Sequence, residues 1–494
     1  MKRREFLKEV GQFAVTVGSY SILAQGMFLQ RAGAAPVPLD GLRRVIGSDD
    51  GVVLGPSDSS YSKFKNGFNL RIQAAPSVIV RCNTVNAVVR SLAWARENGV
   101  PIRLRGGGHS YEGYSTGDGC LIIDVNPMGR ISTDGKFARI GAGSRLGKVY
   151  EALSSKGVII PAGSCPTVCV SGLAQGGGFG LLSRKLGLTC DNVVSMQVVD
   201  VNGRIVNASA DENPDLYWGM RGGGGGNFGV VTDFTFKVSP IGKVITFVLK
   251  WPSARAKEVI QAWQRTMPHA PDELTCILKL SGSSQTGLGE VRCVGQFVAR
   301  NMGETPRESD LQAALRPLTS QVPPSGQTVT TREFLDGANF FSGGEDPPVI
   351  FKAKSDYAVE PLSSQGIDSL LNALKHVSAG ALAVIFDCYG GAVNRVAKDA
   401  TAFAHREGTL HSVQYYAQWG SSSSTPAMLK MMREVHGAAH PFFSGGAYVN
   451  YCDLDVKDWQ TAYFGDNFRR LTEVKRAWDP EYILNFGAQS IPPS

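Results

Sequence analysis

Residues 162–180 read AGSCPTVCVSGLAQGGGFG, and this stretch decides the fold. Two related stretches flank it: residues 105–112 read RGGGHSYE, and residues 221–230 read RGGGGGNFGV. Consecutive glycines permit positive φ and let backbone N–H groups approach a pyrophosphate, which side chains would block. Three such loops in one region indicate a single long ligand.

Each glycine loop also has a plainer interpretation. A glycine loop that carries a histidine is structural more often than catalytic, and five successive glycines at 222–226 resemble a flexible linker. The run is, however, bounded by Trp218 and Phe228 and leads directly into an apolar strand at 230–238, which a linker would not do. The glycines are not spaced as in the nicotinamide-binding fingerprint that opens a helix, so a Rossmann domain is disfavoured.

Length and composition are those of a globular protein with two or three domains. The chain has 494 residues, of which 43% are hydrophobic and 19% charged. The formal net charge is +7, but part of that excess lies in the first eight residues and no basic stripe follows. The sequence therefore gives no reason to expect a nucleic-acid partner.

The N-terminus reads as a targeting signal. Residues 2–8, KRREFLK, form a twin-arginine pattern, followed by a mildly apolar stretch at 13–23 and a small-residue cleavage candidate at 32–34. We expect a twin-arginine signal peptide at 1–36, export by that machinery, and a periplasmic or secreted protein without a stable membrane span. The alternative is an amphipathic first helix or an uncleaved anchor, although the apolar run is shorter than the roughly 20 residues that a span needs.

The nine cysteines do not indicate a disulfide scaffold or a zinc ribbon. Their number is odd, and most of them read as small buried hydrophobes. We expect no metal site. Cys165 is the exception, because it lies within the stretch quoted first.

Strands and helices alternate in the first region. The pattern predicts a helix from Asn83 or Thr84 to Glu97, another at 144–156, and a hairpin at 193–206 that turns at Asn202 and Gly203. The other strands expected there are 78–82, 100–105, 120–125, 137–141 and 230–238.

The pattern changes after residue 243 to that of a second α+β region. Its expected helices are 254–267 and 366–376, with loops at 323–326 and 343–348. Its expected strands are 244–251, 274–280, 291–299, 382–387 and 412–418. The tail from 447 is expected to hold a strand and then one helix at 459–478 before it returns to the first region.

The combination of motifs resembles the berberine bridge enzyme-like flavoproteins, which have the vanillyl-alcohol oxidase (PCMH-type) FAD-binding fold. The motifs are RGGGHSYEGYS, GSCPTVCVSGLAQGGGFG, RGGGGGNFGVVTDFTF, YVNYCDLD, YFGDNFRRLTEVKRAWDP and QSIPP. The resemblance covers nearly all of the chain after the leader and is weakest between residues 243 and 380. It implies an α+β fold with a two-part FAD-binding domain (37–240 and 440–494) around a substrate domain with an antiparallel sheet (241–439).

The resemblance also implies FAD attached through two covalent bonds, from His109 to the 8α-methyl carbon of the flavin and from Cys165, 56 residues later, to its C6. Imidazole nitrogen and thiolate sulfur are good nucleophiles toward an electron-poor quinonoid ring. The other residues expected to bind the cofactor are Arg105, Gly106, Gly107, Gly108, Ser110, Val168, Gly172, Gly176, Gly177, Gly178, Gly180, Asn227, Phe228, Gly229, Val230, Tyr448 and Asn450.

By the same resemblance, Tyr451 is the candidate catalytic base and Asp387 the acidic group beside it. The substrate loses a hydride to flavin N5 while its O–H or N–H loses a proton. A phenol with a pKa of about 10 needs such a partner to act near neutral pH. On a regular strand Tyr448 would face away from Tyr451, so we assign it no catalytic role. Without the resemblance, Tyr451 reads as a half-buried strand aromatic.

The resemblance favours an oxidase, because Val168 occupies a position where valine accompanies oxidases and leucine accompanies dehydrogenases. The expected reaction is oxidation of a sugar or oligosaccharide with reduction of O2 to H2O2, and Tyr415, Tyr416 and Trp419 are candidate stacking faces. Oxidation of a secondary metabolite such as an aromatic alcohol, polyketide or alkaloid is the alternative. A second alternative is that the chain is a flavin-bearing electron-transfer protein.

Overall fold

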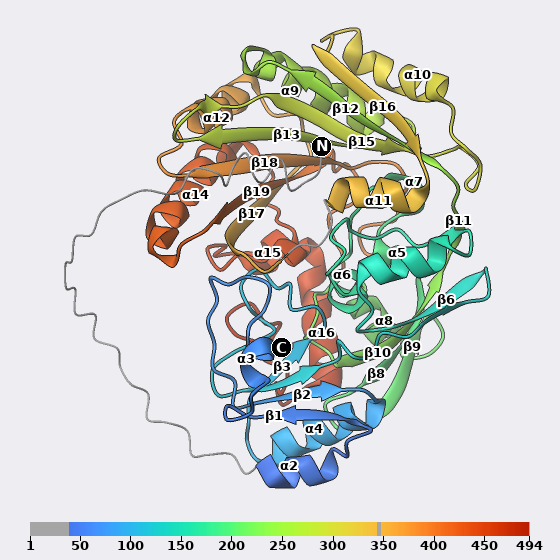
Figure 1. Cartoon of the computed structure of the whole chain (residues 1–494), viewed down its shortest axis with the longest axis vertical. Coiled ribbons are helices and arrows are strands. Elements are labelled where there is room, and N and C mark those ends of the chain that lie inside the picture. Colours follow the sequence, from blue (N-terminus) through green and yellow to red (C-terminus); the bar gives the residue numbers. More distant parts are fainter. Residues whose placement is uncertain (1–38, 343–346, 494) are drawn as a thin grey trace, which may run out of the picture.

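The computed structural model describes residues 39–342 and 347–493. The expected leader at 1–36 therefore lies outside the described residues, as does most of the expected loop at 343–348. The chain forms two sheet-containing halves, one above the other in Figure 1. No helix within the described residues is long and apolar enough to cross a membrane.

One strand of the first sheet in the lower half, β3 (Ile102–Arg105), leads directly into the first glycine loop. Strands β2 (Val78–Cys82), β4 (Leu121–Asp124) and β3 are parallel, and β1 (Gly51–Leu54) pairs with β2 in the antiparallel sense. Helix α4 (Val85–Glu97) makes the crossover, as the sequence predicted. The predicted strand at 78–82 is confirmed residue for residue.

The N-terminus of α4 follows the predicted cap. The hydroxyl of Thr84 accepts a hydrogen bond from the backbone N–H of Ala87, at 3.3 Å. A side-chain acceptor at this position satisfies one of the donors that a helix start leaves unpaired. The local sequence therefore placed this boundary to within one residue, and the structure selects Thr84 over Asn83.

A second sheet of the lower half contains the predicted hairpin. Its strand order is β5 (Ile131–Thr133), β6 (Phe137–Gly141), β10 (Val230–Lys237), β8 (Val193–Val199) and β9 (Ile205–Ser209). Val199 pairs with Ile205 across the turn, and Gly203 there has φ +78°. The hairpin prediction is confirmed.

The upper half is built on an antiparallel sheet of eight strands. The strand order is β16 (Gly326–Arg332), β12 (Val244–Trp251), β15 (Val291–Phe297), β13 (Leu274–Ser283), β18 (Ala381–Cys388), β19 (His411–Trp419) and β17 (Ile350–Ala358), with β14 (Gly287–Leu288) paired to β13. The sequence predicted five of these strands. It missed the two-residue strand β14 and the edge strands β16 and β17, whose many polar residues conceal the apolar pattern of a strand.

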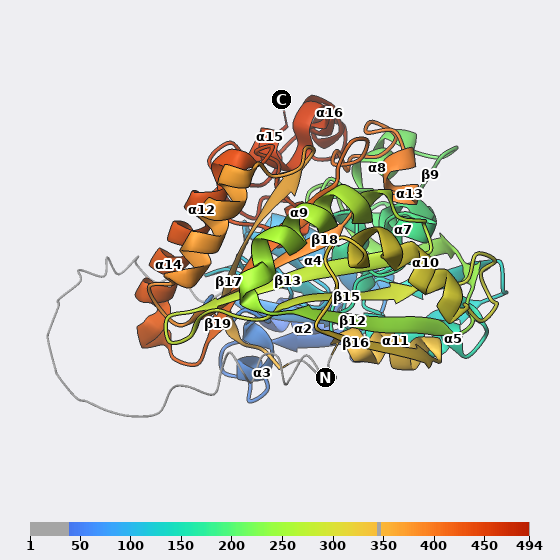
Figure 2. The ribbon, with the colours of Figure 1, turned by 90° about the horizontal axis from the view of Figure 1, so that it is seen from above.

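Four helices cover one face of this sheet. They are α9 (Ala256–Thr266), α10 (Glu308–Thr319), α12 (Ser364–Lys375) and α14 (Thr425–Ala439). Figures 1 and 2 show them on the side of the sheet that faces away from the lower half. Leu278, Val384 and Tyr415 of the sheet are buried in the core beneath them. The opposite face of the sheet is thus directed toward the lower half.

The C-terminal segment packs into the core of the lower half. The helix predicted at 459–478 is two helices, α15 (Trp459–Phe464) and α16 (Phe468–Trp478), because Gly465 between them adopts φ +51°. The predicted strand after 447 is also wrong: residues Val449–Tyr451 form one turn of 3-10 helix.

The buried lysine Lys475 fixes this segment. Its Nζ donates to Asp479 at 2.7 Å and to the backbone oxygens of Asn227 and Leu484 at 2.6 and 2.8 Å. Because a buried ammonium needs such partners, the tail is tied to the third glycine loop.

The remaining elements are short connections around the two halves. They are α2 (Leu39–Val45), α3 (Tyr61–Lys65), α5 (Leu146–Ser154), β7 (Val158–Ile159) paired with β11 (Ser239–Pro240), α6 (Val170–Gln175), α7 (Ser183–Leu186), α8 (Pro214–Gly219), α11 (Phe334–Ser342) and α13 (Ala392–Arg395).

Candidate active site

A large cavity lies between the glycine loops and the open face of the eight-stranded sheet. The predicted cofactor-binding residues that line it are Arg105, Gly106, Gly107, Gly108, His109, Ser110, Cys165, Val168, Gly172, Gly180, Asn227, Gly229, Val230, Tyr448 and Asn450. Both candidate catalytic residues, Tyr451 and Asp387, line it as well. Residues from opposite ends of the chain thus meet in one cavity.

The first two glycine loops pack directly against each other. A Cβ added to Gly107 would lie 2.9 Å from the backbone nitrogen of Cys169 and 3.0 Å from the backbone oxygen of Thr167. A Cβ added to Gly106 would lie 2.6 Å from the hydroxyl of Ser171. Only glycine permits so close an approach of the two loops.

This packing brings the segments of His109 and Cys165 together. The Nε2 atom of His109 lies 3.0 Å from the hydroxyl of Thr167, two residues after Cys165. The imidazole also stacks on Phe68, with ring centroids 4.1 Å apart and planes at 21°. The sequence analysis missed Thr167, although it lies within the quoted motif. It fixes the orientation of the ring by holding one of its nitrogens.

Ser110 shapes the turn that follows His109. Its hydroxyl accepts a hydrogen bond from the backbone N–H of Tyr114 at 2.9 Å and lies 3.7 Å from the sulfur of Cys452. Arg105, at the start of the loop, lies 3.4 Å from Asp124 on the neighbouring strand. The loop is therefore held at both ends by side-chain contacts.

Three glycines of the second loop, Gly176, Gly177 and Gly178, do not line the cavity. Each is in close contact with a neighbouring side chain instead, and Gly176 shows this most clearly. A Cβ there would lie 2.0 Å from the Oδ1 atom of Asn450. The glycines that we expected to approach a phosphate serve here to let segments pack closely.

In the third loop, Asn227 has a structural role beside its place in the cavity wall. Its side-chain nitrogen donates to the backbone oxygen of Gly223 at 3.1 Å, and its Oδ1 accepts from the backbone N–H of Ile491, also at 3.1 Å. The next residue, Phe228, is fully buried in the core and does not line the cavity. The loop is thus an ordered part of the fold and not a linker.

Tyr451 and Tyr448 lie in contact, contrary to the prediction that they point to opposite faces. Their rings meet edge to face at 4.8 Å, because the backbone there is helical and not extended. The hydroxyl of Tyr448 accepts hydrogen bonds from the backbone N–H of Gly178 and from Asn450, both at 2.9 Å. Tyr448 therefore supports Tyr451 from one side.

Tyr111 supports Tyr451 from another side. The two rings stack in parallel, with centroids 5.3 Å apart and planes at 6°. The hydroxyl of Tyr111 accepts a hydrogen bond from Gln414 of β19 at 2.9 Å. Tyr111 belongs to the first glycine motif, so its stacking joins that loop to the candidate catalytic tyrosine.

Asp387 is a buried carboxyl group with a perturbed pKa. Burial raises the pKa of Asp387 to about 7, against the opposing effects of the Lys279 charge and of a hydrogen bond from Ser412. Burial, followed by the negative charge of Asp387, also raises the pKa of Tyr451 well above its usual range. Near neutral pH the phenol is therefore protonated, while Asp387 exchanges a proton readily.

The sheet side of the cavity presents side chains from alternate strand positions. Tyr416 and Phe351 stack at 5.4 Å and line the cavity together with Lys279 and Gln414. Tyr415, also a candidate stacking face, is instead fully buried beneath the helices. Trp419 does not line the cavity and donates its indole N–H to Thr425 at 2.9 Å.

Two family models match the chain. One, described as an FAD binding domain, matches residues 76–209, and the other, described as berberine and berberine like, matches residues 447–492. Berberine bridge enzyme-like 4 of Arabidopsis thaliana is 31% identical to the chain, over 88% of each protein. The chain belongs to the berberine bridge enzyme-like family of FAD-linked oxidoreductases.

Further similar proteins are an FAD-linked oxidoreductase and two solved structures. The FAD-linked oxidoreductase YgaK of Bacillus subtilis is 34% identical, over 90% of this chain and 97% of its own. The solved structure of Physcomitrella patens BBE-like 1 superposes with a TM-score of 0.83 at 31% identity, over 92% of this chain and 99% of that one. A chitooligosaccharide oxidase superposes with a TM-score of 0.81 at 27% identity, over the same shares of the two chains.

The cavity of this family member fits FAD. Gly172 lines it and has no atom within 4 Å of the position of an added Cβ, and at Gly225 the nearest atom is 3.8 Å away. Backbone thus faces open space at these two points, which suits the close approach of a cofactor. An imidazole and a thiol, which are the two side chains suited to forming bonds to a flavin ring, line the same space.

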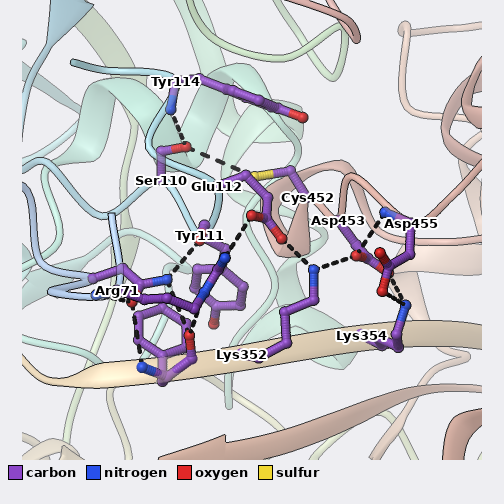
Figure 3. Close-up of polar contacts among 12 residues, drawn as sticks. Arg71, Ser110, Tyr111, Glu112, Tyr114, Lys352, Lys354, Cys452, Asp453 and Asp455 are labelled. Carbon is purple, nitrogen blue, oxygen red and sulfur yellow. Dashed lines mark hydrogen bonds and ion pairs between the residues drawn. The ribbon is translucent and has the colours of Figure 1, made fainter. Parts of the chain in front are cut away.

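A buried network of ion pairs joins the two halves beside this cavity (Figure 3). Its members are three cations and three carboxylates: Arg71, Lys352, Lys354, Glu112, Asp453 and Asp455. Lys352 of β17 pairs with both Glu112 and Asp453, and Lys354 lies 2.6 Å from Asp453. Burial lowers the pKa of Lys352, but the charges of Asp453 and Glu112 outweigh it and raise that pKa.

The network connects both candidate functional segments to the edge of the sheet. Glu112 lies three residues after His109, and Asp453 lies two residues after Tyr451. Because buried ions of opposite sign hold one another firmly once desolvated, the network fixes these segments relative to the substrate side of the cavity. The sequence analysis missed it, since its members come from four separate stretches of the chain.

Proposed function

We propose that this protein is an oxidase that carries FAD through two covalent bonds and oxidises an alcohol or hemiacetal of a sugar or oligosaccharide. One observation carries the proposal: the loops of His109 and Cys165 pack together in the cavity that Tyr451 and Asp387 also line. The chemistry supplied by bound FAD is acceptance of a hydride at N5, followed by transfer of two electrons to O2 to give H2O2.

The covalent attachment rests on His109 and Cys165. His109 would bond the 8α-methyl carbon through its imidazole, whose orientation is fixed by the contact between its Nε2 atom and Thr167. Cys165 would bond C6. Two links hold the isoalloxazine without a closed pocket around it, which suits a large substrate.

For proton transfer, Tyr451 takes the proton of the substrate hydroxyl while its own proton passes to Asp387. The raised pKa of the phenol makes an isolated tyrosinate costly at neutral pH, so a concerted transfer is favoured over a preformed base. A carboxylate with a pKa of about 7 is a suitable acceptor at that pH. Tyr111 and Tyr448 hold the ring of Tyr451 in place by their contacts.

A sugar is the favoured substrate because the sheet side of the cavity combines an aromatic face with hydrogen-bonding groups. Tyr416 and Phe351 provide the aromatic face, and Gln414, Lys279 and Asp387 provide polar atoms. A chitooligosaccharide oxidase is among the similar structures. The second candidate is a secondary metabolite such as an aromatic alcohol, polyketide or alkaloid, favoured by the apolar lining of Phe341, Ile277 and Ile385.

Val168 supports the assignment of O2 as the electron acceptor. It lies three residues after Cys165, lines the cavity and has the small side chain expected of an oxidase. The twin-arginine pattern at 2–8 supports export by the twin-arginine machinery, which carries folded proteins with their cofactors, to the periplasm or the outside of the cell.

Mass spectrometry of the acid-denatured protein tests the attachment. We expect the mass of FAD to stay on the wild-type chain and on Cys165→Ala, which retains the bond from His109, and to be lost when His109→Ala is combined with Cys165→Ala. Flavin released from the wild-type chain by acid would disprove covalent attachment.

A substrate panel tests the reaction. Release of H2O2 is measured with mono- and oligosaccharides, aromatic alcohols and amines, and we expect turnover with sugars. Turnover with aromatics alone would support the second candidate. Flavin reduction without H2O2 release would exclude O2 as the acceptor. In the Val168→Leu variant, O2 should reoxidise the reduced flavin more slowly than in the wild type.

A further inference from the structure

A carboxylate and two histidines meet on the helix-covered face of the eight-stranded sheet. Asp356 of β17 contacts both His436 of α14 and His440, which begins the 3-10 turn His440–Phe442. The Nε2 atom of His436 is 3.3 Å from Asp356 Oδ2, and the Nδ1 atom of His440 is 2.6 Å from Asp356 Oδ1. One donor atom from each residue lies within 4.8 Å of the other two.

The fold satisfies only one oxygen of the buried carboxylate: Oδ1 has the close contact with His440, whereas Oδ2 has only His436, at 3.3 Å, and the nearby Tyr415 hydroxyl around it. Asp356 is 0% exposed, and its Oδ2 atom has no hydrogen-bond partner. A buried carboxylate oxygen without a partner is costly, so such an atom usually marks a bound ion or water. The oxygen is directed toward the same space as the imidazole of His436.

We propose that Asp356, His436 and His440 bind Zn2+. Two imidazole nitrogens and one carboxylate oxygen form a donor set typical of zinc, whereas Mg2+ and Ca2+ prefer oxygen atoms alone. The two histidines are four residues apart at the end of a helix, which places both on one face. The exposed fraction of the His440 side chain is 46%, so water has access to the fourth position.

The distances agree with this coordination after a small adjustment. Donor atoms about 2.0–2.1 Å from a tetrahedral Zn2+ lie about 3.3 Å apart, which is the separation of His436 Nε2 and Asp356 Oδ2. The widest separation among the three donor atoms, which is at most 4.8 Å, must contract when Zn2+ binds. The half-exposed ring of His440 has room to rotate for this purpose.

The site is separate from the cavity that holds the proposed flavin. In the register of the sheet, Asp356 pairs with Val413, which is buried under the helices, and Ser355 pairs with Gln414, which lines the cavity. Successive side chains of a strand point to opposite faces, so Asp356 is directed away from the cavity. Bound zinc would connect the end of α14 to the edge strand β17 and so stabilise this corner of the sheet.

The test uses the full-length holoprotein without a polyhistidine tag and Zn2+ as the only added ligand. Calorimetric titration of the wild-type protein should give one Zn2+ per chain, and Zn2+ should raise its melting temperature. Loss of an outer partner of a metal ligand typically weakens binding 10- to 100-fold, so His440→Gln, which removes a ligand, should weaken it about 100-fold or more. Asp356→Asn is the second variant.

His376→Gln is the matched control, because this histidine is exposed on another helix end and hydrogen-bonded only within its own turn. Its affinity for Zn2+ should equal that of the wild type. The visible flavin spectrum and circular dichroism verify that each variant is folded. Absence of binding to the wild type, or wild-type affinity for Zn2+ in both His440→Gln and Asp356→Asn, would overturn the proposal.

Discussion

The two sides of the central cavity are constructed in different ways. The lower side consists of glycine loops from contiguous motifs, where backbone is packed against backbone, as between Gly107 and Cys169. The upper side consists of side chains at alternate positions of strands that are far apart in the sequence, such as Lys279, Asp387 and Tyr416. Where two loops meet, the lower side therefore tolerates no added atom, whereas the upper side can exchange side chains without a change of fold.

This difference assigns a separate task to each side. A cofactor that is the same throughout a family requires a fixed backbone surface, and substrates that differ between members require replaceable side chains. Tyr451 and the ion network around Lys352 lie where the two sides meet. Substitutions at the junction should therefore have larger effects than those on either side alone.

The largest effect is expected for Tyr451→Phe. Removal of the hydroxyl removes the group that receives the substrate proton, so the rate of flavin reduction should fall about 100- to 10,000-fold. Anaerobic stopped-flow measurement of flavin absorbance checks this. Tyr416→Phe is the control, because its hydroxyl interacts with Gln418 and its ring remains, and we expect a change smaller than about tenfold. Near-normal reduction in Tyr451→Phe would remove this residue from the mechanism.

The next effect is expected on stability, from Lys352→Met. Both carboxylates that share this lysine would lose a buried partner, so the free energy of unfolding should fall by about 3 kcal/mol or more. Chemical denaturation followed by tryptophan fluorescence measures it. The exposed pair Lys398–Asp466 is the control, and Lys398→Met should change the free energy of unfolding by less than about 1 kcal/mol. Equal effects of the two substitutions would show that the network does not stabilise the junction of the two sides.

Two glycines on the lower side separate packing from cofactor binding. Gly176→Ala places a Cβ against Asn450 and should destabilise the fold by about 1–3 kcal/mol. Gly172→Ala places its Cβ in the open cavity, so the apoprotein should keep its stability while flavin incorporation decreases. Thermal unfolding and the ratio of flavin to protein absorbance measure the two quantities. Full flavin incorporation in Gly172→Ala would show that FAD does not approach this backbone.

The smallest effect is expected from pH. Burial raises the pKa of Asp387 to about 7, so its carboxylate is present above that pH and is protonated below it. Because the proposed proton acceptor is the carboxylate, the rate of flavin reduction should be about tenfold lower at pH 6 than on the alkaline plateau. Stopped-flow rates across this range check the prediction. Asp387→Asn should be slower at pH 8 and should lose this pH dependence, and an unchanged profile would exclude Asp387 as the acceptor.

The sequence was most informative where a local rule decides the structure. The turn at Gly203 and strand β2 are determined by neighbouring residues and were predicted, and the cap of α4 was predicted to within one residue, at Asn83 or Thr84. The predictions failed where tertiary contacts override the local pattern. Gly465 interrupts an otherwise helical sequence, and the strand expected around Tyr451 is a helical turn packed between two other tyrosines.

The sequence by itself determined the family, the α+β fold, FAD as the cofactor, and the loops that line its cavity, because glycine motifs carry their constraint within a few residues. Only the tertiary structure revealed Thr167 beside His109, Tyr111 stacked on Tyr451, and the buried network around Lys352. It alone brought Asp356 beside His436 of α14 and His440 of the turn that follows. The physical reason is that hydrogen bonds, stacking and ion pairing act over a few ångströms in space, whereas these partners are separated by tens to hundreds of residues along the chain.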